Sequence, residues 1–229
     1  MSLFAIGDTH LSFGTNKPMN IFHGWDNYVE RLEANWLKLI SNEDTVVIMG
    51  DVSWAMSLEE ALKDFTFLNN LPGQKIVIKG NHDYWWNTRK KMEAFLNENN
   101  LNTISILHNN SFIADGISVC GTRGWFFDAE ADADKKIVSR EAERLKRSIE
   151  AGRKLSDEVI VFLHYPPINN MQKCETIYNV LVEEHITRCY YAHLHSASAY
   201  NSFNGVSDGI KFELLSGDYL KFCPKLIRK

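Results

Sequence analysis

Five short apolar runs, each followed by Asp, Asn or His, constrain the fold of this chain more than any other feature. The runs read as strands and cover residues 3–7, 44–50, 74–79, 159–163 and 189–192. Helical patterns separate most of them, which predicts parallel strands in an α/β core. Ligands bind outside the carboxyl ends of such strands, so we expect the polar residues that follow the runs to converge.

Helical periodicity is predicted over residues 25–40, 58–68, 87–98, 135–152 and 174–185. Ser57 and Glu60 have the spacing of a capping box. Residues 103–122 read as two or three short strands with turns at 109–110 and 115–116, and residues 197–224 as a β-meander. Because the strands are apolar throughout, both of their faces should be covered. With no linker or repeat, residues 1–229 are expected to form a single domain.

Composition excludes several classes of protein. The net charge of −4 and the lack of a Lys/Arg-rich tract argue against membrane attachment and extended nucleic-acid binding. The N-terminal residues do not resemble a signal peptide, and no apolar run approaches the length of a membrane span. The four cysteines form no C-x-x-C pair, so we expect free thiols and a cytoplasmic location. They are Cys120, Cys174, Cys189 and Cys223.

The polar residues at the strand ends have the composition of a metal site. Buried carboxylates and imidazoles would be expensive to desolvate without a cation. Nitrogen and oxygen ligands without thiolate suit Mn²⁺, our first expectation, or Fe, Zn, Co or Ni. Seven candidates exceed the four ligands of a structural zinc site, whereas two metals sharing a carboxylate would use them all. They are Asp8, His10, Asp51, Asn81, His164, His193 and His195.

The order of these motifs resembles that of the calcineurin-like metallophosphoesterases. D-x-H, G-D, G-N-H-D, H and H-x-H follow one another between Asp8 and His195. Each motif alone has an ordinary explanation as a turn, a cap or a structural histidine, but five in this order favour the family. The resemblance implies a two-sheet β-sandwich flanked by helices, a four-layer αββα fold.

The resemblance also implies a division of the metal ligands. One metal would be held by Asp8, His10 and His195, and the other by Asn81, His164 and His193. Asp51 would bridge both, together with a hydroxide that attacks phosphorus in line. His82 would lie beside the scissile phosphate and stabilise charge or protonate the leaving group, with Asp83 orienting it. The Asn81 amide would also contact the phosphate.

Three further features have a functional and a structural explanation each. Arg123 could bind a substrate phosphate oxygen or form a surface salt bridge. Three tryptophans could stack on a base or an aromatic leaving group, or could pack in the core. They are Trp85, Trp86 and Trp125. The loop 123–134, aromatic and acidic, could be a lid or a solvated loop.

Departures from the family pattern indicate which branch of the family this chain resembles. Ala192 replaces the usual glycine before the first histidine of the last motif, which should alter backbone approach slightly. Trp54 stands where purple acid phosphatases have a metal-binding tyrosine, so a colourless protein is expected. Leu11 follows His10, and the stretch after Asp51 lacks the arginine of Ser/Thr protein phosphatases. The bacterial phosphodiesterase-like branch fits best.

These observations predict a metal-dependent phosphoric ester hydrolase that acts on a phosphorylated small molecule. A phosphodiesterase or a broad small-molecule phosphohydrolase is the first expectation. The alternatives are a phosphomonoesterase, including a protein phosphatase, and a catalytically silent scaffold. A silent scaffold is expected to lose ligands, whereas this chain retains all seven together with His82.

Overall fold

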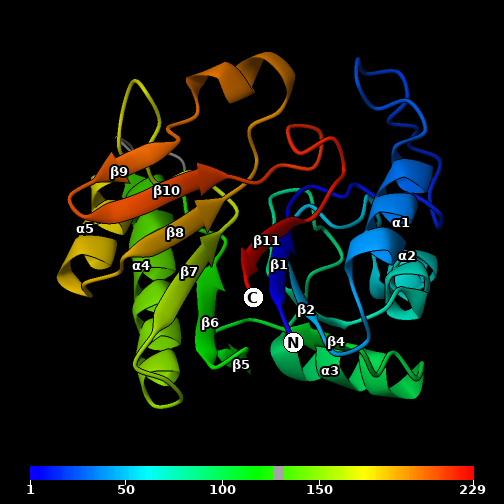
Figure 1. Ribbon diagram of the computed structural model, residues 1–229, viewed down its shortest axis with the longest axis horizontal. Coiled ribbons are helices and arrows are strands. Elements are labelled where there is room, and N and C mark those ends of the chain that lie inside the picture. The colour runs from blue at the N-terminus through cyan, green and yellow to red at the C-terminus, as the bar shows by residue number, and fades with distance from the viewer. Residues whose placement is uncertain (126–131) are drawn as a thin grey trace.

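The computed structural model describes residues 1–125 and 132–229 and contains two sheets flanked by helices (Figure 1). The five-stranded sheet has the order β11-β1-β2-β3-β4. Its strands are β1 Leu3–Ile6, β2 Thr45–Ile48, β3 Gln74–Val77, β4 Ile104–Ile106 and β11 Lys225–Arg228. The six-stranded sheet has the order β5-β6-β7-β8-β10-β9. Its strands are β5 Phe112–Ala114, β6 Ile117–Thr122, β7 Val159–Leu163, β8 Arg188–Tyr191, β9 Gly205–Ser207 and β10 Ile210–Leu214.

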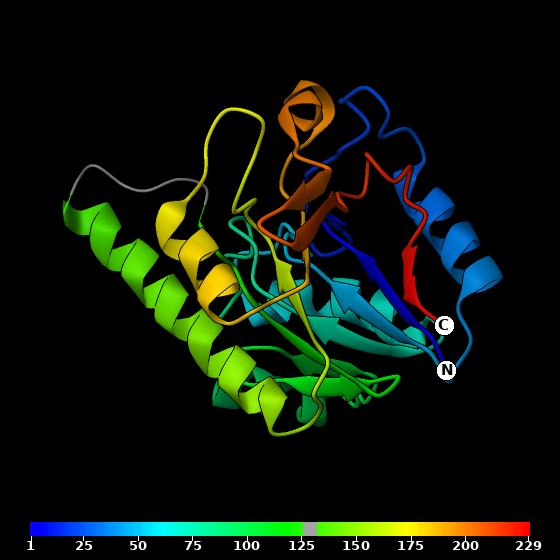
Figure 2. The same cartoon turned by 60° about the vertical axis from the view of Figure 1, so that its left-hand side comes forward.

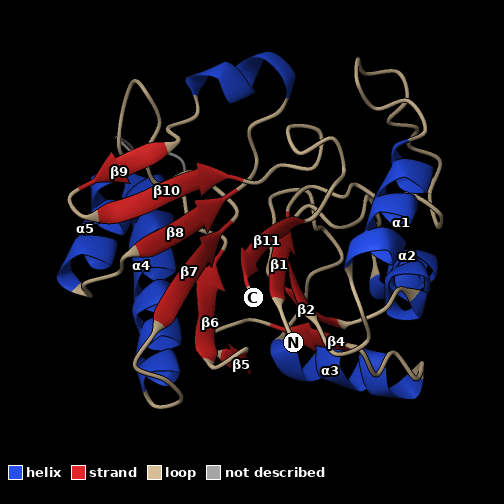
Figure 3. Ribbon diagram, viewed as in Figure 1, coloured by secondary structure: helices blue, strands red, loops and turns tan. Residues whose placement is uncertain are grey.

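Helices cover the outer face of each sheet, which confirms the predicted sandwich. Figures 1 and 3 show α1 Tyr28–Leu39, α2 Leu58–Asn70 and α3 Arg89–Glu98 beside the five-stranded sheet. Figure 2 shows α4 Asp132–Arg153 and α5 Glu175–Glu183 lying together against the six-stranded sheet. No helix among the described residues is long and apolar enough to cross a membrane.

Alternation along the strands explains why both faces are apolar. In β1, Leu3 and Ala5 point into the layer between the sheets, whereas Phe4 and Ile6 pack in the core beneath the first three helices. The other core lies between the six-stranded sheet and α4 and α5. A strand buried on both faces favours apolar residues at every position, as β1 and β7 have.

Most element boundaries agree with the sequence to within a few residues, and the capping-box residues cap α2. The hydroxyl of Ser57 accepts the N–H of Glu60 at 3.3 Å. The Glu60 carboxylate accepts the N–H of Met56, at 2.8 Å, instead of the N–H of Ser57. The four cysteines are free, as predicted.

The predicted β-meander over residues 197–224 is wrong. Ser196–Asn201 forms a 3-10 helix, and β10 pairs in parallel with β8 after an antiparallel hairpin with β9. The chain then crosses to the other sheet, where β11 pairs antiparallel with β1. Alternation of apolar residues marks a half-buried strand but does not specify the direction of pairing or the partner sheet.

Candidate metal centre

The candidate ligands follow parallel strands in both sheets, so they meet at one edge of the sandwich. β1, β2 and β3 pair in parallel in one sheet, as do β7 and β8 in the other. The loops after these strands are joined by backbone hydrogen bonds. The N–H of Asp8 donates to Gly50 at 3.0 Å, and the N–H of Ala192 donates to His164 at 3.0 Å. The backbone therefore brings the predicted residues together before their side chains interact.

Two glycines permit the close approach of these loops. A Cβ on Gly80 would lie 2.1 Å from both the backbone nitrogen and a carboxylate oxygen of Asp51, so no larger residue fits. A Cβ on Gly7 would lie 2.4 Å from the Cβ of Ala192. The methyl group of Ala192, the departure from the family pattern, therefore packs against the bare backbone of Gly7.

Four candidate ligands have a left-handed backbone, which few non-glycine residues adopt. The φ angles are 56° for Asp8, 42° for His10, 50° for Asp51 and 73° for His193. Such conformations carry strain on the order of 1 kcal/mol each and gather at functional sites. The strain is the consequence of turning these side chains sharply inward at the strand ends.

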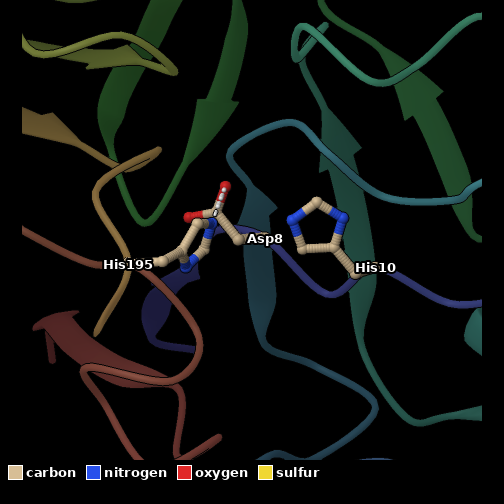
Figure 4. Close-up of side chains that lie close together, drawn as sticks. All are labelled: Asp8, His10 and His195. Carbon is tan, nitrogen blue, oxygen red and sulfur yellow. Dashed lines mark ion pairs between the residues drawn. The ribbon is translucent and has the colours of Figure 1, made fainter. Parts of the chain in front are cut away.

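The first group consists of Asp8, His10 and His195, whose ligand atoms lie within 4.8 Å of one another. Figure 4 shows the Asp8 carboxylate directed at His195, with His10 on the other side of Asp8 in this view. Asp8 Oδ1 lies 3.4 Å from His195 Nε2. Neither atom has a hydrogen-bond partner among the residues that the structure describes, although both are buried.

The second group consists of Asp51, His164 and His193, again within 4.8 Å of one another. Asn81 adjoins it, because its Oδ1 lies 2.6 Å from His164 Nε2. One Asp51 oxygen, Oδ2, is 3.7 Å from His10 Nε2 and 3.6 Å from His164 Nε2. Asp51 thus lies between the two groups, and all seven predicted ligands meet at one place.

The pKa shifts of the clustered carboxylates and imidazoles favour the binding of a cation. Burial and then the Asp8 carboxylate raise the pKa of Asp51 to about 8. Burial would lower the pKa of His195, yet Asp8 and Asp218 outweigh it and raise that pKa to about 10. Burial and then His164 lower the pKa of His193 to about 3, and burial also lowers the pKa of His10 well below its usual value. Two carboxylates therefore crowd together with imidazoles of two kinds, since His10 and His193 favour the neutral form and His195 favours the protonated form.

The residues fit divalent metal ions. Neutral imidazoles and carboxylates are the forms that bind metal, and no thiolate is present in the cluster. Asp8 Oδ1 and His195 Nε2 form an ion pair at 3.4 Å but have no hydrogen-bond partner among the described residues. A cation would satisfy both atoms and neutralise the charge that the burial of two aspartates accumulates.

Residues outside the predicted set orient the imidazoles. Asp218 Oδ1 lies 2.8 Å from His195 Nδ1, and the carbonyl of Met49 lies 3.0 Å from His164 Nδ1. The hydroxyl of Tyr28 donates to the carbonyl of His10 at 2.7 Å. A partner on the second ring nitrogen fixes the tautomer of a metal-binding histidine. The sequence contained no local signal for Asp218, which comes from a loop beyond β10.

The carboxylate of Asp83, which was expected to orient His82, contacts backbone N–H groups instead of the His82 ring. Asp83 is buried, and its carboxylate accepts backbone N–H groups of Asp51, Val52 and Gly80 at 2.9, 2.8 and 2.7 Å. Nδ1 of His82 has no hydrogen-bond partner among the described residues. The turn directs Asp83 inward, so it positions the loop that carries Asp51.

His82 lies beside both groups without belonging to either. Its ring centroid is 5.8 Å from that of His10 and 4.6 Å from that of Trp54. Burial lowers the pKa of His82, and the neighbouring His164 adds to the effect. The backbone N–H of His82 donates to Asp51 Oδ1 at 2.7 Å. Its half-buried imidazole therefore stands at the edge of the cluster, open to a ligand.

The remaining candidates divide between the core and the edge of the site. Trp85 is buried, and its Nε1 donates to Asp83 at 3.0 Å, so it is a core residue. Trp86 is half-buried and packs against His108. Arg123 stacks over Trp125 at 4.9 Å, and it lies 3.6 Å from a buried carboxylate, that of Glu141. A surface salt bridge is therefore not its environment. Residues 126–131 of the loop 123–134 lie outside the described residues.

Comparison with known proteins identifies the same family as the order of the motifs does. The sequence profile described as calcineurin-like phosphoesterase matches residues 1–197. No curated protein matches the sequence. Several solved structures share the fold over most of their length.

One is phosphopantetheinyl hydrolase from Mycobacterium tuberculosis, with a TM-score of 0.60 and 13% identity. The match covers 99% of this chain and 95% of that one. A protein of unknown function from Aquifex aeolicus matches with a TM-score of 0.51 and 16% identity, over 98% and 95% of the two chains. A Thermus thermophilus protein matches with a TM-score of 0.55 and 15% identity, over 84% and 81%. These similarities cover most of the chain, so they concern the fold as a whole and not only the motifs.

Proposed function

The chain belongs to the calcineurin-like phosphoesterase family, and on that premise we propose that it is a metal-dependent hydrolase of phosphoric esters. We propose phosphodiesters, or a broad range of small phosphorylated molecules, as its substrates. The neighbour named phosphopantetheinyl hydrolase is consistent with a hydrolase on this fold. Mn²⁺ is the first metal to test, since nitrogen and oxygen ligands suit it.

The convergence of two ligand groups on Asp51 carries the proposal. Each group gathers its ligand atoms within 4.8 Å, and Asp51 lies within 3.7 Å of an imidazole from each. A single metal would leave one group unused, whereas two metals would employ both. Asp8, His10 and His195 would hold one metal; Asn81, His164 and His193 would hold the other, with Asp51 shared.

Two bound divalent ions would supply Lewis acidity, a lowered pKa for water and a clamp on the attacking and leaving oxygens. The protein's own groups complete the site. Asp218 and the Met49 carbonyl hold the rings of His195 and His164, and Asp83 holds the backbone of Asp51. Such positioning keeps the charges fixed before the substrate arrives.

We propose that His82 assists at the phosphate. Its imidazole adjoins the cluster but is not needed to complete either ligand group. In its neutral form it has one N–H to donate, and as an imidazolium it can transfer a proton to a leaving oxygen. The nearby ring of Trp54 is stacked on His10 at 4.9 Å. We assign His82 to stabilisation or protonation of the leaving group.

Hydrolysis of paired chromogenic substrates tests this function. Chelator-stripped protein, resupplied with Mn²⁺, is assayed with bis-p-nitrophenyl phosphate and with p-nitrophenyl phosphate. Metal-restored cleavage of the diester supports a phosphodiesterase, and preference for the monoester supports a phosphomonoesterase. Asp51→Asn should abolish both, whereas Asp157→Asn, on the exposed surface, should abolish neither. Two bound metals without turnover of either substrate would contradict a broad specificity.

A further inference from the structure

Helix α4 has a stripe of cations on one face, apart from the candidate metal ligands. Lys136, Arg140, Arg144 and Arg147 recur every three or four residues, which places them on the same side of the helix. The whole chain has a net charge of −4, so this basic stripe is a local feature. Like charges at these spacings destabilise a helix. An anion bound to the stripe would reverse that effect.

The three arginines of the basic stripe line a cavity of about 370 Å³. This size lies at the lower end of the range for small-molecule sites. Its other lining residues are Asn109, Ser139 and Glu143. Three guanidinium groups thus face one carboxylate, and the side-chain oxygen of Asn109 is buried without a hydrogen-bond partner among the described residues. We call this space the arginine cavity.

The arginines differ in how they are held. Arg144 donates to Glu141 at 2.5 Å, and Glu141 is only 1% exposed. The hydroxyl of Thr122 fixes the other oxygen of Glu141 at 2.6 Å. Arg140 and Arg147 are exposed and form no ion pair with a residue that the structure describes. One arginine is therefore anchored in place, and two are available to bind a ligand.

A chain of contacts joins the arginine cavity to the candidate metal centre. Glu141, which holds Arg144, also lies 3.6 Å from Arg123. The carbonyl of Arg123 accepts the backbone N–H groups of His164 and Tyr165 at 3.2 and 2.9 Å. Arg123 therefore stands between the cavity and the loop that carries His164.

We infer that the arginine cavity binds a second phosphate group of the same substrate whose ester is cleaved at the metal centre. Guanidinium groups match phosphate through paired hydrogen bonds, which Arg140 and Arg147 of this cavity can supply. Arg123 would lie between the two phosphates. The inference rests on the proposed function and narrows its substrate class to small molecules with at least two phosphate groups.

Inhibition of bis-p-nitrophenyl phosphate hydrolysis by the Mn²⁺-loaded full chain tests the inference. Alkane bisphosphates of increasing spacer length are compared with the corresponding alkyl monophosphates. At the spacer length that spans the two places, the bisphosphate should inhibit about tenfold more tightly than its monophosphate. In an Arg140→Gln/Arg147→Gln double variant the ratio of the monophosphate to the bisphosphate inhibition constant should fall close to one. Each variant's own monophosphate inhibition constant serves as its reference.

Lys146→Gln is the matched control, because it removes a charge from the same helix without lining the arginine cavity. It should retain the bisphosphate advantage. If turnover is normal but the bisphosphate inhibits no more tightly than the monophosphate at any spacer length, the inference is wrong. It is also wrong if the tighter inhibition survives in the double variant. Either result leaves the proposed function intact. Absence of turnover in wild-type protein with Mn²⁺ overturns the proposed function, and the inference falls with it.

Discussion

Asp83→Asn separates two roles for this carboxylate, the orienting of His82 and the support of the Asp51 loop. Oδ1 accepts the N–H groups of Val52 and the Trp85 ring, at 2.8 and 3.0 Å. Oδ2 accepts those of Asp51 and Gly80, at 2.9 and 2.7 Å. Asparagine keeps one acceptor oxygen and presents an NH₂ group where the other oxygen was. The N–H of Ser53 also donates to Oδ1, at 3.4 Å, so either orientation of the amide leaves at least two buried N–H donors unsatisfied.

The magnitude follows from those two donors. Each buried donor without a partner costs about 1–3 kcal/mol, so the variant should lose about 2–6 kcal/mol of unfolding free energy. Urea denaturation of metal-stripped protein measures the loss free of any metal contribution. Because the backbone of Asp51 is no longer held, the metal content of purified Asp83→Asn should also fall. Elemental analysis would measure that content.

Asp157→Asn makes the same chemical change at an exposed position and should alter stability by less than about 0.5 kcal/mol. The reasoning is refuted if Asp83→Asn unfolds as wild type does and loses only kcat. That result would return Asp83 to the role of orienting His82.

Three further changes test separate parts of the site and fold. His82→Ala should retain both metals by elemental analysis and lose roughly 10²–10⁴ in kcat, and loss of metal would contradict its assignment. Asp218→Ala should weaken metal binding roughly 10–100-fold in a chelator competition, because it removes the group that contacts Nδ1 of His195, and unchanged affinity would refute this. Burial lowers the pKa of Lys75 to about 8, below its unfolded value of 10.5. As the pH rises, Lys75 therefore loses its proton at a lower pH in the native state than in the unfolded state. The free energy of unfolding of wild type, measured in urea, should therefore rise between about pH 8 and pH 10.5 relative to that of Lys75→Met. The rise should be at most about 1.4 kcal/mol per pH unit. Parallel plots of unfolding free energy against pH for the two proteins would refute this.

The parts of the site that follow from strand ends could be predicted from the sequence. A buried parallel strand is apolar at every position, so its end is marked by the first polar residue. Asp8, Asp51 and His164 each occupy that position. Parallel pairing then gathers them at one edge without any further information. The packing of two sheets into a sandwich was available only through the resemblance to the family.

Contacts made across long distances in sequence could not be predicted. Asp218 reaches His195 from a loop whose position depends on the crossing of the chain between sheets. The resemblance to the family implied that Asp83 orients His82, but successive side chains in a tight turn point in different directions. Glu141 on α4 reads as part of a solvated helix face, yet it is buried beside Arg123. Charge patterns show composition, whereas burial depends on packing.

The most direct test of a dinuclear centre is anomalous X-ray scattering from crystals of the full chain grown with Mn²⁺. Two manganese peaks about 3.5–4 Å apart are expected. One should lie against Asp8, His10 and His195, the other against Asn81, His164 and His193, with Asp51 between them. A single peak, or peaks away from these residues, would contradict the account.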